Sequence, residues 1–360
     1  MKSARNNSLD LLRIICMMMI VALHFFNHGG LVPGTGNWYA GNLVVALCYV
    51  AVNCMVLLTG YFQCTSRFKL KRLASVWIQA FFYSVVLYVC AAAFTRSLSV
   101  TELIKNAMVA TMKRYWYVTA YLLLYAVSPF LNCAFQAMTR RMHLLCCAVL
   151  LLIFSVMHNL VYISDFGNVL GGSSFLWFCV LYTVAAYIRL HVPEQSINRN
   201  TALGVYFVCA MLIAAERFAA YMITPLIFGR VVLDSFFFSY NSIMTSTASI
   251  ALFLAMRNVT VNGNLANRWI EFFAPLTFGV YLIHDHHAVR PLLWGFLNPA
   301  AAADSVWMLP YGVICITGIF LLCCLIEWVR KWIFRRIGII GLIEACCDRI
   351  QKRAELWLAQ

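Results

Sequence analysis

The chain has 360 residues, of which 63% are hydrophobic and 11% are charged, and its formal net charge is +14. With a mean hydropathy of +0.81, this composition excludes an ordinary soluble globular protein and favours a membrane protein. The positive residues are spread in small patches between apolar runs and form no basic face with interleaved aromatic residues. Membrane topology therefore explains the charge better than nucleic-acid binding does, and we expect no nucleic-acid partner.

Apolar runs of about 20 residues recur along the chain, each long enough to cross the lipid bilayer as a helix. We predict an all-α polytopic membrane protein with ten transmembrane helices, near residues 8–28, 40–62, 74–94, 115–134, 143–161, 174–190, 201–220, 236–256, 270–292 and 307–329. Both termini are predicted to be cytosolic, because this orientation places about three quarters of the Lys and Arg residues on the inner side. The 15 cysteines lie mostly inside these spans and are interpreted as small buried apolar residues.

No linker divides the membrane part, so we assign residues 1–332 to one integral-membrane domain. Residues 333–360, with arginines and apolar residues at helical spacing, are predicted to form a cytosolic amphipathic tail. Residues 101–114 are predicted to form an amphipathic helix in the long outer loop.

The first span, "NNSLDLLRIICMMMIVALHFF" (6–26), contains three ionisable residues, Asp10, Arg13 and His24. At about 100° per residue these three residues share one side of a helix. Arg13 is then near the cytosolic end of the helix, and His24 lies about 16 Å further into the membrane. Ionisable groups in the membrane usually face a cavity or a partner. Taken singly, the first two could be an interfacial ion pair and the third a core histidine. Their alignment favours a functional role for this row of three residues, here called the polar seam. Within it, the histidine is the side chain suited to act as a general base.

The motif "HDHH" (284–287) raises the question of a metal site. His284 and His287 have the spacing of two ligands on one helical face, but Asp285 is predicted to point away from them, and no other acidic partner stands at a fixed distance. We therefore expect no metal. The chain also contains no glycine motif typical of a nucleoside triphosphate or nicotinamide site.

Five stretches in order carry a resemblance to a known family: "LDLLRIIC" with ten residues between Arg13 and His24, "AVNCMVLLTGYF" (51–62), "FKLKRLASVW" (68–77), "WYVTAYLLLYAVSPFLN" (116–132) and "LTFGVYLIHDHH" (276–287). Together they resemble the integral-membrane acyltransferase family called acyltransferase type 3, which includes bacterial O-acetyltransferases. The resemblance covers roughly residues 5–330. The chain differs in having Cys16 where a small alanine is usual and Thr59 where a serine is usual.

The resemblance implies a bundle of about ten helices in the bacterial cytoplasmic membrane that moves an acyl group, usually acetyl, from cytosolic acyl-coenzyme A. The acceptor would be a hydroxyl of an envelope glycan or glycolipid. Carried over residue by residue, His24 is the catalytic candidate and Arg13 its partner on the cofactor side. Lys69 and Arg72 stand where a basic cofactor-binding pair is usual, although a lysine lacks the bidentate geometry of arginine toward phosphate.

His284 falls on a histidine position of the family, and we assign His284 and Asp10 to the acceptor-binding side of the site. We favour general-base catalysis by His24 over a covalent acyl-histidine. The main alternative is a carrier or exporter of an envelope precursor that uses the polar seam as a proton relay. A carrier is expected to have Gly- or Pro-broken helices at matching positions of two halves, and the sequence does not show them. A third alternative is a degenerate family member that serves as a membrane scaffold, but such a protein would not need to keep both Arg13 and His24. The acceptor, the acyl chain length, the oxyanion donor and the oligomeric state stay open at this point.

Overall fold

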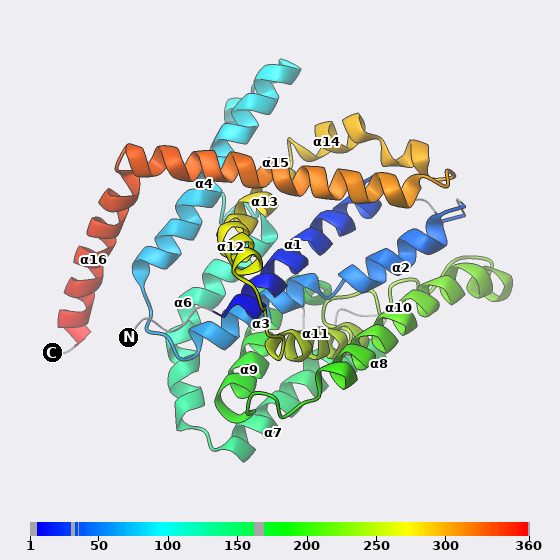
Figure 1. Cartoon of the computed structure of the whole chain (residues 1–360), viewed down its shortest axis with the longest axis horizontal. Coiled ribbons are helices and arrows are strands. Elements are labelled where there is room, and N and C mark those ends of the chain that lie inside the picture. Colours follow the sequence, from blue (N-terminus) through cyan, green and yellow to red (C-terminus); the bar gives the residue numbers. More distant parts are fainter. Residues whose placement is uncertain (1–5, 30–32, 35, 162–168, 359–360) are drawn as a thin grey trace.

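The computed structural model describes residues 6–29, 33–34, 36–161 and 169–358. Within this part of the chain all the regular elements are helices (Figure 1). They are α1 (Asn7–His28), α2 (Trp38–Cys48), α3 (Ala51–Gln63), α4 (Leu70–Thr95), α5 (Val100–Ala107), α6 (Trp116–Ala137), α7 (Arg140–Leu151), α8 (Met157–Leu160), α9 (Phe175–His191), α10 (Arg199–Phe228), α11 (Ile243–Arg257), α12 (Asn264–Phe273), α13 (Thr277–His284), α14 (Arg290–Leu297), α15 (Met308–Arg336) and α16 (Ile339–Leu358). Short π or 3-10 turns are η1 (Leu152–Val156), η2 (Leu170–Gly172), η3 (Ala274–Leu276) and η4 (Pro299–Ala302).

The central helix of the bundle is α1, which contacts α2, α3, α11, α12, α13 and α15. The Asn6 side chain caps its start by accepting a hydrogen bond from the backbone of Leu9 at 3.1 Å, which satisfies one of the free N–H groups of the first turn. The carboxylate of Asp10 in this turn also favours the positive end of the helix dipole. A local sequence signal therefore fixes where α1 begins.

The prediction of a helical polytopic membrane protein is confirmed. In the described part of the chain, seven helical segments are long and apolar enough to span a membrane: 7–28, 38–63, 70–95, 116–137, 140–160, 199–228 and 308–336. Two further apolar helices, α9 and α11, have 17 and 15 residues. The total of ten spans and the cytosolic location of the termini stay predictions.

Two predicted spans are shortened or broken in the structure. The helix expected at 236–256 begins only at Ile243, because the Ser242 side chain caps it by accepting from the backbone of Thr245 at 3.2 Å. The span expected at 270–292 is divided into α12, η3 and α13, with Pro275 at the start of η3. Its last part leaves the helix after His284, and this break creates the loop that carries Asp285.

Helices approach each other closely at Gly60 and Gly279. A Cβ atom at Gly60 would lie 2.7 Å from the Cβ of Ala185, so the missing side chain lets α3 pack tightly on α9. A Cβ atom at Gly279 would lie 2.6 Å from Cγ of Glu327, which places that carboxylate against the backbone of α13. The second contact holds α13 beside α15.

The tail forms the separate helix α16, and α15 continues past the predicted boundary to Arg336. In Figure 1 α16, in red, runs back beside the start of α4. The Gln351 side chain accepts a hydrogen bond from the backbone of Leu70 at 2.9 Å and donates one to the carbonyl of Phe68 at 3.2 Å, while Asp348 lies 3.5 Å from Lys71. The tail therefore packs on the basic segment that precedes α4.

Candidate active site

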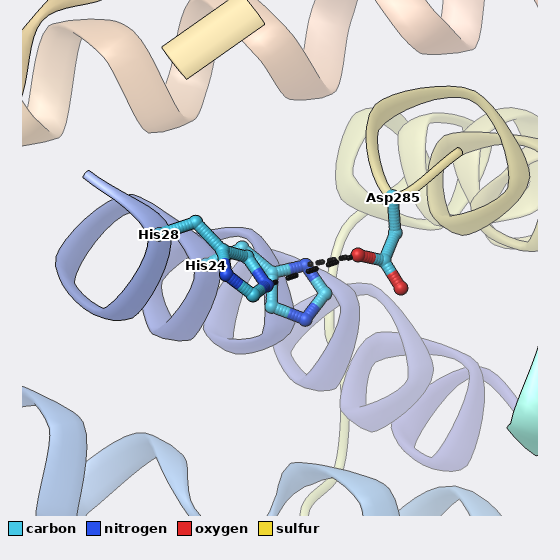
Figure 2. Close-up of side chains that lie close together, drawn as sticks. All are labelled: His24, His28 and Asp285. Atoms are coloured by element: carbon cyan, nitrogen blue, oxygen red, sulfur yellow. Dashed lines mark ion pairs between the residues drawn. The ribbon is translucent and has the colours of Figure 1, made fainter. Parts of the chain in front are cut away.

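Two histidines from α1 and one aspartate from the loop after α13 meet near the end of α1 (Figure 2). His24 and His28 are one helical turn apart, and their ring centroids lie 5.0 Å from each other. Asp285 Oδ1 lies 3.6 Å from His24 Nδ1 and 4.0 Å from His28 Nε2. The same oxygen lies 2.7 Å from Nη2 of Arg290, the first residue of α14, so a guanidinium balances the charge of the carboxylate.

The hydrogen bonds of His284 determine which nitrogen of His24 is free. His284 Nδ1 lies 2.6 Å from the carbonyl oxygen of Val280, which can only accept, so this nitrogen carries the proton. In the neutral ring Nε2 of His284 is then an acceptor, and it lies 2.9 Å from His24 Nδ1. His24 therefore donates from Nδ1 and keeps the lone pair on its Nε2. This is the tautomer that a general base requires.

A cavity with aromatic walls lies beside this cluster. The atom-free space between its lining residues, counted with the interstices and the open solvent, is about 490 Å³. Its wall includes His24 and Asp285 at one end and extends along α1 to Met17. The remaining lining comes from four other segments: Val52, Met55, Trp116, Tyr117, Tyr240, Phe278 and Tyr281, with Ile20 and Leu23 of α1 itself. Within the described residues the buried hydroxyl of Tyr281 has no hydrogen-bond partner, so it is free to bind a guest in this cavity.

Arg13 lies one helical turn before the part of α1 that lines the cavity, and about 16 Å from His24 along the helix axis. Its Nη1 bonds to Asp10 Oδ1 at 2.9 Å. The structure therefore places Asp10 with Arg13 at the start of α1, and does not bring it to His284.

Lys69 and Arg72 lie at the start of α4, on the same side of the bundle as Arg13. The side chains of both are exposed, and Nη1 of Arg72 bonds to Gln63 Oε1 at 3.2 Å. The positive charges of Arg13 and Arg72 both act on the phenol of Tyr121, so both residues lie on the side of the bundle where this tyrosine stands.

A row of tyrosines on α6 connects this basic region with the cavity. Tyr117, Tyr121 and Tyr125 follow each other at intervals of one helical turn, with ring centroids 6.3 and 6.4 Å apart and nearly parallel planes. The Tyr125 hydroxyl donates to the carbonyl of Lys69 at 3.2 Å, while Tyr117 lines the cavity. An aromatic surface thus extends from the basic segment to the cavity that contains His24.

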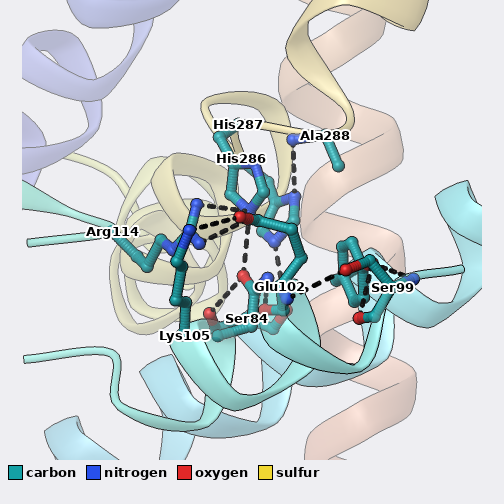
Figure 3. Close-up of polar contacts among 10 residues, drawn as sticks. Ser84, Ser99, Glu102, Lys105, Arg114, His286, His287 and Ala288 are labelled. Atoms are coloured by element: carbon teal, nitrogen blue, oxygen red, sulfur yellow. Dashed lines mark hydrogen bonds and ion pairs between the residues drawn. The ribbon is translucent and has the colours of Figure 1, made fainter. Parts of the chain in front are cut away.

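His286 and His287 belong to a different polar network, which fastens the loop after α13 to α4 and α5 (Figure 3). His286 Nε2 donates to the carbonyl of Ser84 at 3.1 Å, and its Nδ1 accepts from the backbone of Ala288 at 3.1 Å. His287 Nε2 lies 2.9 Å from Oδ1 of the buried Asn106. Because α13 ends at His284, His287 does not share a helix face with His284. His286 and His287 instead hold the backbone of the loop that carries Asp285.

Glu102 on α5 completes this network and gives a pH-dependent prediction. It pairs with Lys105 at 2.8 Å and with Arg114, and these two partners lower the pKa of Glu102 from 4.5 to about 2. Because the folded-state pKa is depressed, the pairing stabilises the protein fully above pH 5 and is lost as the pH falls toward 2. We expect Glu102→Gln to lower the thermal unfolding temperature at pH 7, and the difference from wild type to shrink between pH 5 and pH 2.5. The measurement is a thermal melt of both proteins across this range, and a difference that is the same at every pH would contradict the expectation.

Sequence reasoning missed three members of the cluster: His28, Asp285 and Arg290. The interval of four residues between His24 and His28 was a visible signal, since residues one turn apart share a helix face. The prediction that Asp285 points away was wrong. It assumed that α13 continues, whereas Asp285 follows the last helical residue and turns toward α1. Nothing local in the sequence indicates that Arg290 would lie beside it.

The fold and the site define a multi-pass helical membrane protein with a partly buried histidine–carboxylate cluster. No curated protein and no solved structure matches the chain significantly. The family model described as an acyltransferase domain matches residues 6–328. The chain therefore belongs to the acyltransferase 3 family and is an acyltransferase, which confirms the resemblance stated from the sequence motifs.

Proposed function

We propose that this acyltransferase moves an acetyl or other acyl group from cytosolic acyl-coenzyme A to a hydroxyl of an envelope glycan or glycolipid, in the bacterial cytoplasmic membrane. The observation that carries the proposal is the pair formed by His24 and His284, in which His24 keeps Nε2 unprotonated at one end of a cavity. This is an arrangement for removing a proton from an alcohol.

His24 Nε2 takes the proton of the acceptor hydroxyl as its oxygen attacks the thioester carbon. The C–O bond forms and the C–S bond breaks, and the proton passes from His24 to the departing thiolate, so the histidine returns to its neutral form. His284 fixes the tautomer by accepting from Nδ1 at 2.9 Å. Asp285, 3.6 Å from the same nitrogen, stabilises the transient imidazolium.

The negative oxygen on the thioester carbon needs a hydrogen-bond donor. Tyr281 fits this role, because its buried hydroxyl has no partner among the described residues and its side chain lines the cavity together with His24. Tyr281→Phe removes the donor while it keeps the ring, and thus separates this role from packing.

Coenzyme A carries phosphates, and the exposed Lys69 and Arg72 with Arg13 supply cations on one side of the bundle. The row of tyrosines on α6 leads from the basic segment to the cavity, and the acyl-bearing arm of coenzyme A would lie along it. In this proposal Arg13 lies at the entrance through which coenzyme A binds, and Asp10 positions its side chain. His284 lies on the side of the site that binds the acceptor. No metal is required for the reaction.

We expect the double variant Lys69→Ala, Arg72→Ala to raise KM for acetyl-coenzyme A about tenfold or more with little change in kcat. Losing a charge-assisted contact costs about 1.5–3 kcal/mol of binding, and binding common to substrate and transition state affects KM alone. Steady-state kinetics with Arg141→Ala, an exposed arginine at the start of α7, is the matched control. An equal rise in KM in the control would assign the effect to general surface charge.

The function itself is tested with the purified protein in nanodiscs, supplied with acetyl-coenzyme A and an envelope extract. Free thiol release and incorporation of labelled acetyl into the extract are measured together. The expected result is thiol release that depends on the extract and labels one of its components. If the protein neither binds nor hydrolyses acetyl-coenzyme A in this mixture, the donor assignment fails, and transport of an envelope precursor becomes the function to test.

A further inference from the structure

The cluster at the end of α1 presents more donor atoms than general-base catalysis uses. His24, His28 and Asp285 each offer a nitrogen or oxygen, and these three atoms lie within 4.8 Å of one another (Figure 2). His284 Nε2, 2.9 Å from His24 Nδ1, adds a fourth donor with a lone pair directed into the group. The reaction proposed above gives no role to His28.

The distances suit a small divalent cation. Two ligands bound to one tetrahedral Zn²⁺ at about 2.0–2.1 Å lie roughly 3.3 Å apart. The measured separations of 2.9 Å between His24 and His284, 3.6 Å between His24 and Asp285 and 4.0 Å between His28 and Asp285 lie on both sides of this value. The donor atoms of His24, His28 and Asp285 already lie within 4.8 Å of one another, and His284 would join them by exchanging its hydrogen bond to His24 for the ion.

Two further features are typical of metal ligands. His284 donates its other ring nitrogen to the carbonyl of Val280, which is the outer contact that orients most metal-binding histidines. Asp285 Oδ1 is buried and, within the described residues, accepts no aligned hydrogen bond, although Arg290 lies close to it as an ion pair. Such an oxygen has an unused lone pair directed at two imidazoles. His28, with one third of its side chain exposed, provides the route of entry.

We propose that His24, His28, His284 and Asp285 form an inhibitory site for Zn²⁺ or a similar borderline divalent cation. When the ion binds, it is coordinated by the lone pair of His24 Nδ1, so the proton of the neutral ring must be carried by Nε2. His24 then has no free lone pair for the acceptor hydroxyl, and acyl transfer stops until the ion leaves. The inhibition rests on the proposed function, whereas binding of the ion does not.

Arg290 opposes the ion, because its guanidinium occupies the same carboxylate oxygen at 2.7 Å. The site is therefore tuned toward moderate affinity. Removing the guanidinium in Arg290→Gln is expected to tighten zinc binding, while His28→Gln is expected to weaken it.

The test uses the full-length protein in nanodiscs with its cysteines alkylated, since 15 cysteines offer competing thiolates. Zn²⁺ binding is measured by competition with a chromophoric chelator, and Co²⁺ is added separately to record its visible spectrum. We expect one ion per chain, a Co²⁺ spectrum without thiolate charge transfer, at least tenfold weaker binding in His28→Gln and tighter binding in Arg290→Gln. Equal binding by wild type and His28→Gln, or no binding at all, would overturn the proposal.

Acyl-transfer assays then connect the site with activity. Zn²⁺ is expected to inhibit wild type reversibly, with recovery on adding EDTA, whereas His28→Gln needs at least tenfold more Zn²⁺ for the same fractional inhibition of its own turnover. If the ion binds at this site and no acyl transfer is found, the binding site stands and the proposed function fails. If transfer is found and zinc inhibits both proteins at the same concentration, the function stands and the site fails.

Discussion

Replacing His24 with glutamine is expected to reduce acyl transfer by about 10²–10⁴-fold, the usual contribution of a positioned general base. Glutamine keeps a donor toward His284 Nε2 but has no basic nitrogen for the acceptor hydroxyl. The loss should appear in kcat, because the side chain acts in the transition state and lies about 16 Å along α1 from Arg13, which is assigned to the cofactor side. The measurement is thiol release and acetyl incorporation by both proteins in nanodiscs.

His143 offers the matched control for this experiment. It is a fully buried histidine, whose Nε2 lies 3.1 Å from the carbonyl of Thr183 and whose ring stacks on Phe135, and it does not line the cavity. His143→Gln is expected to keep kcat even if its thermal stability falls. His284→Gln should lose activity to an intermediate degree, since the amide oxygen still accepts from His24 Nδ1. Full activity of His24→Gln would refute the general base.

Glu327→Ala is expected to destabilise the protein by about 3–5 kcal/mol, because it leaves buried positive charge without a partner. The Glu327 side chain on α15 is completely buried. Arg330 donates to both of its oxygens, at 2.8 and 2.7 Å, Tyr83 of α4 donates at 2.8 Å, and Lys331 lies 3.5 Å away. This cluster joins α4 to α15, and the contact with Gly279 adds α13.

Equilibrium unfolding in detergent or bicelles measures this loss. Glu344→Ala, which removes an exposed carboxylate from α16, is the control and should leave the unfolding free energy nearly unchanged. Glu327→Gln keeps an acceptor for Tyr83 and is expected to cost less than the alanine variant. Equal stability of Glu327→Ala and wild type would show that the cluster contributes no net stability.

The sequence determined the features of this protein that depend on neighbours along the chain. Apolar runs of sufficient length indicated helices because only helices satisfy backbone hydrogen bonds locally in a membrane. The same periodicity put Arg13 and His24 on one stripe of α1, and the structure shows this stripe along the wall of the cavity through Met17, Ile20 and His24. The motif order was enough to indicate the family.

Only the tertiary structure decided which residues meet. His24 and His284 are 260 positions apart in sequence, and their contact depends on how α13 packs between α1 and α15. The direction of Asp285 depends on α13 ending at His284, and the burial of Glu327 depends on a glycine of α13 that leaves room for it. Helical periodicity is a property of one segment, whereas these contacts arise from side-chain packing between segments. The hydrophobic pattern of each helix therefore does not specify them.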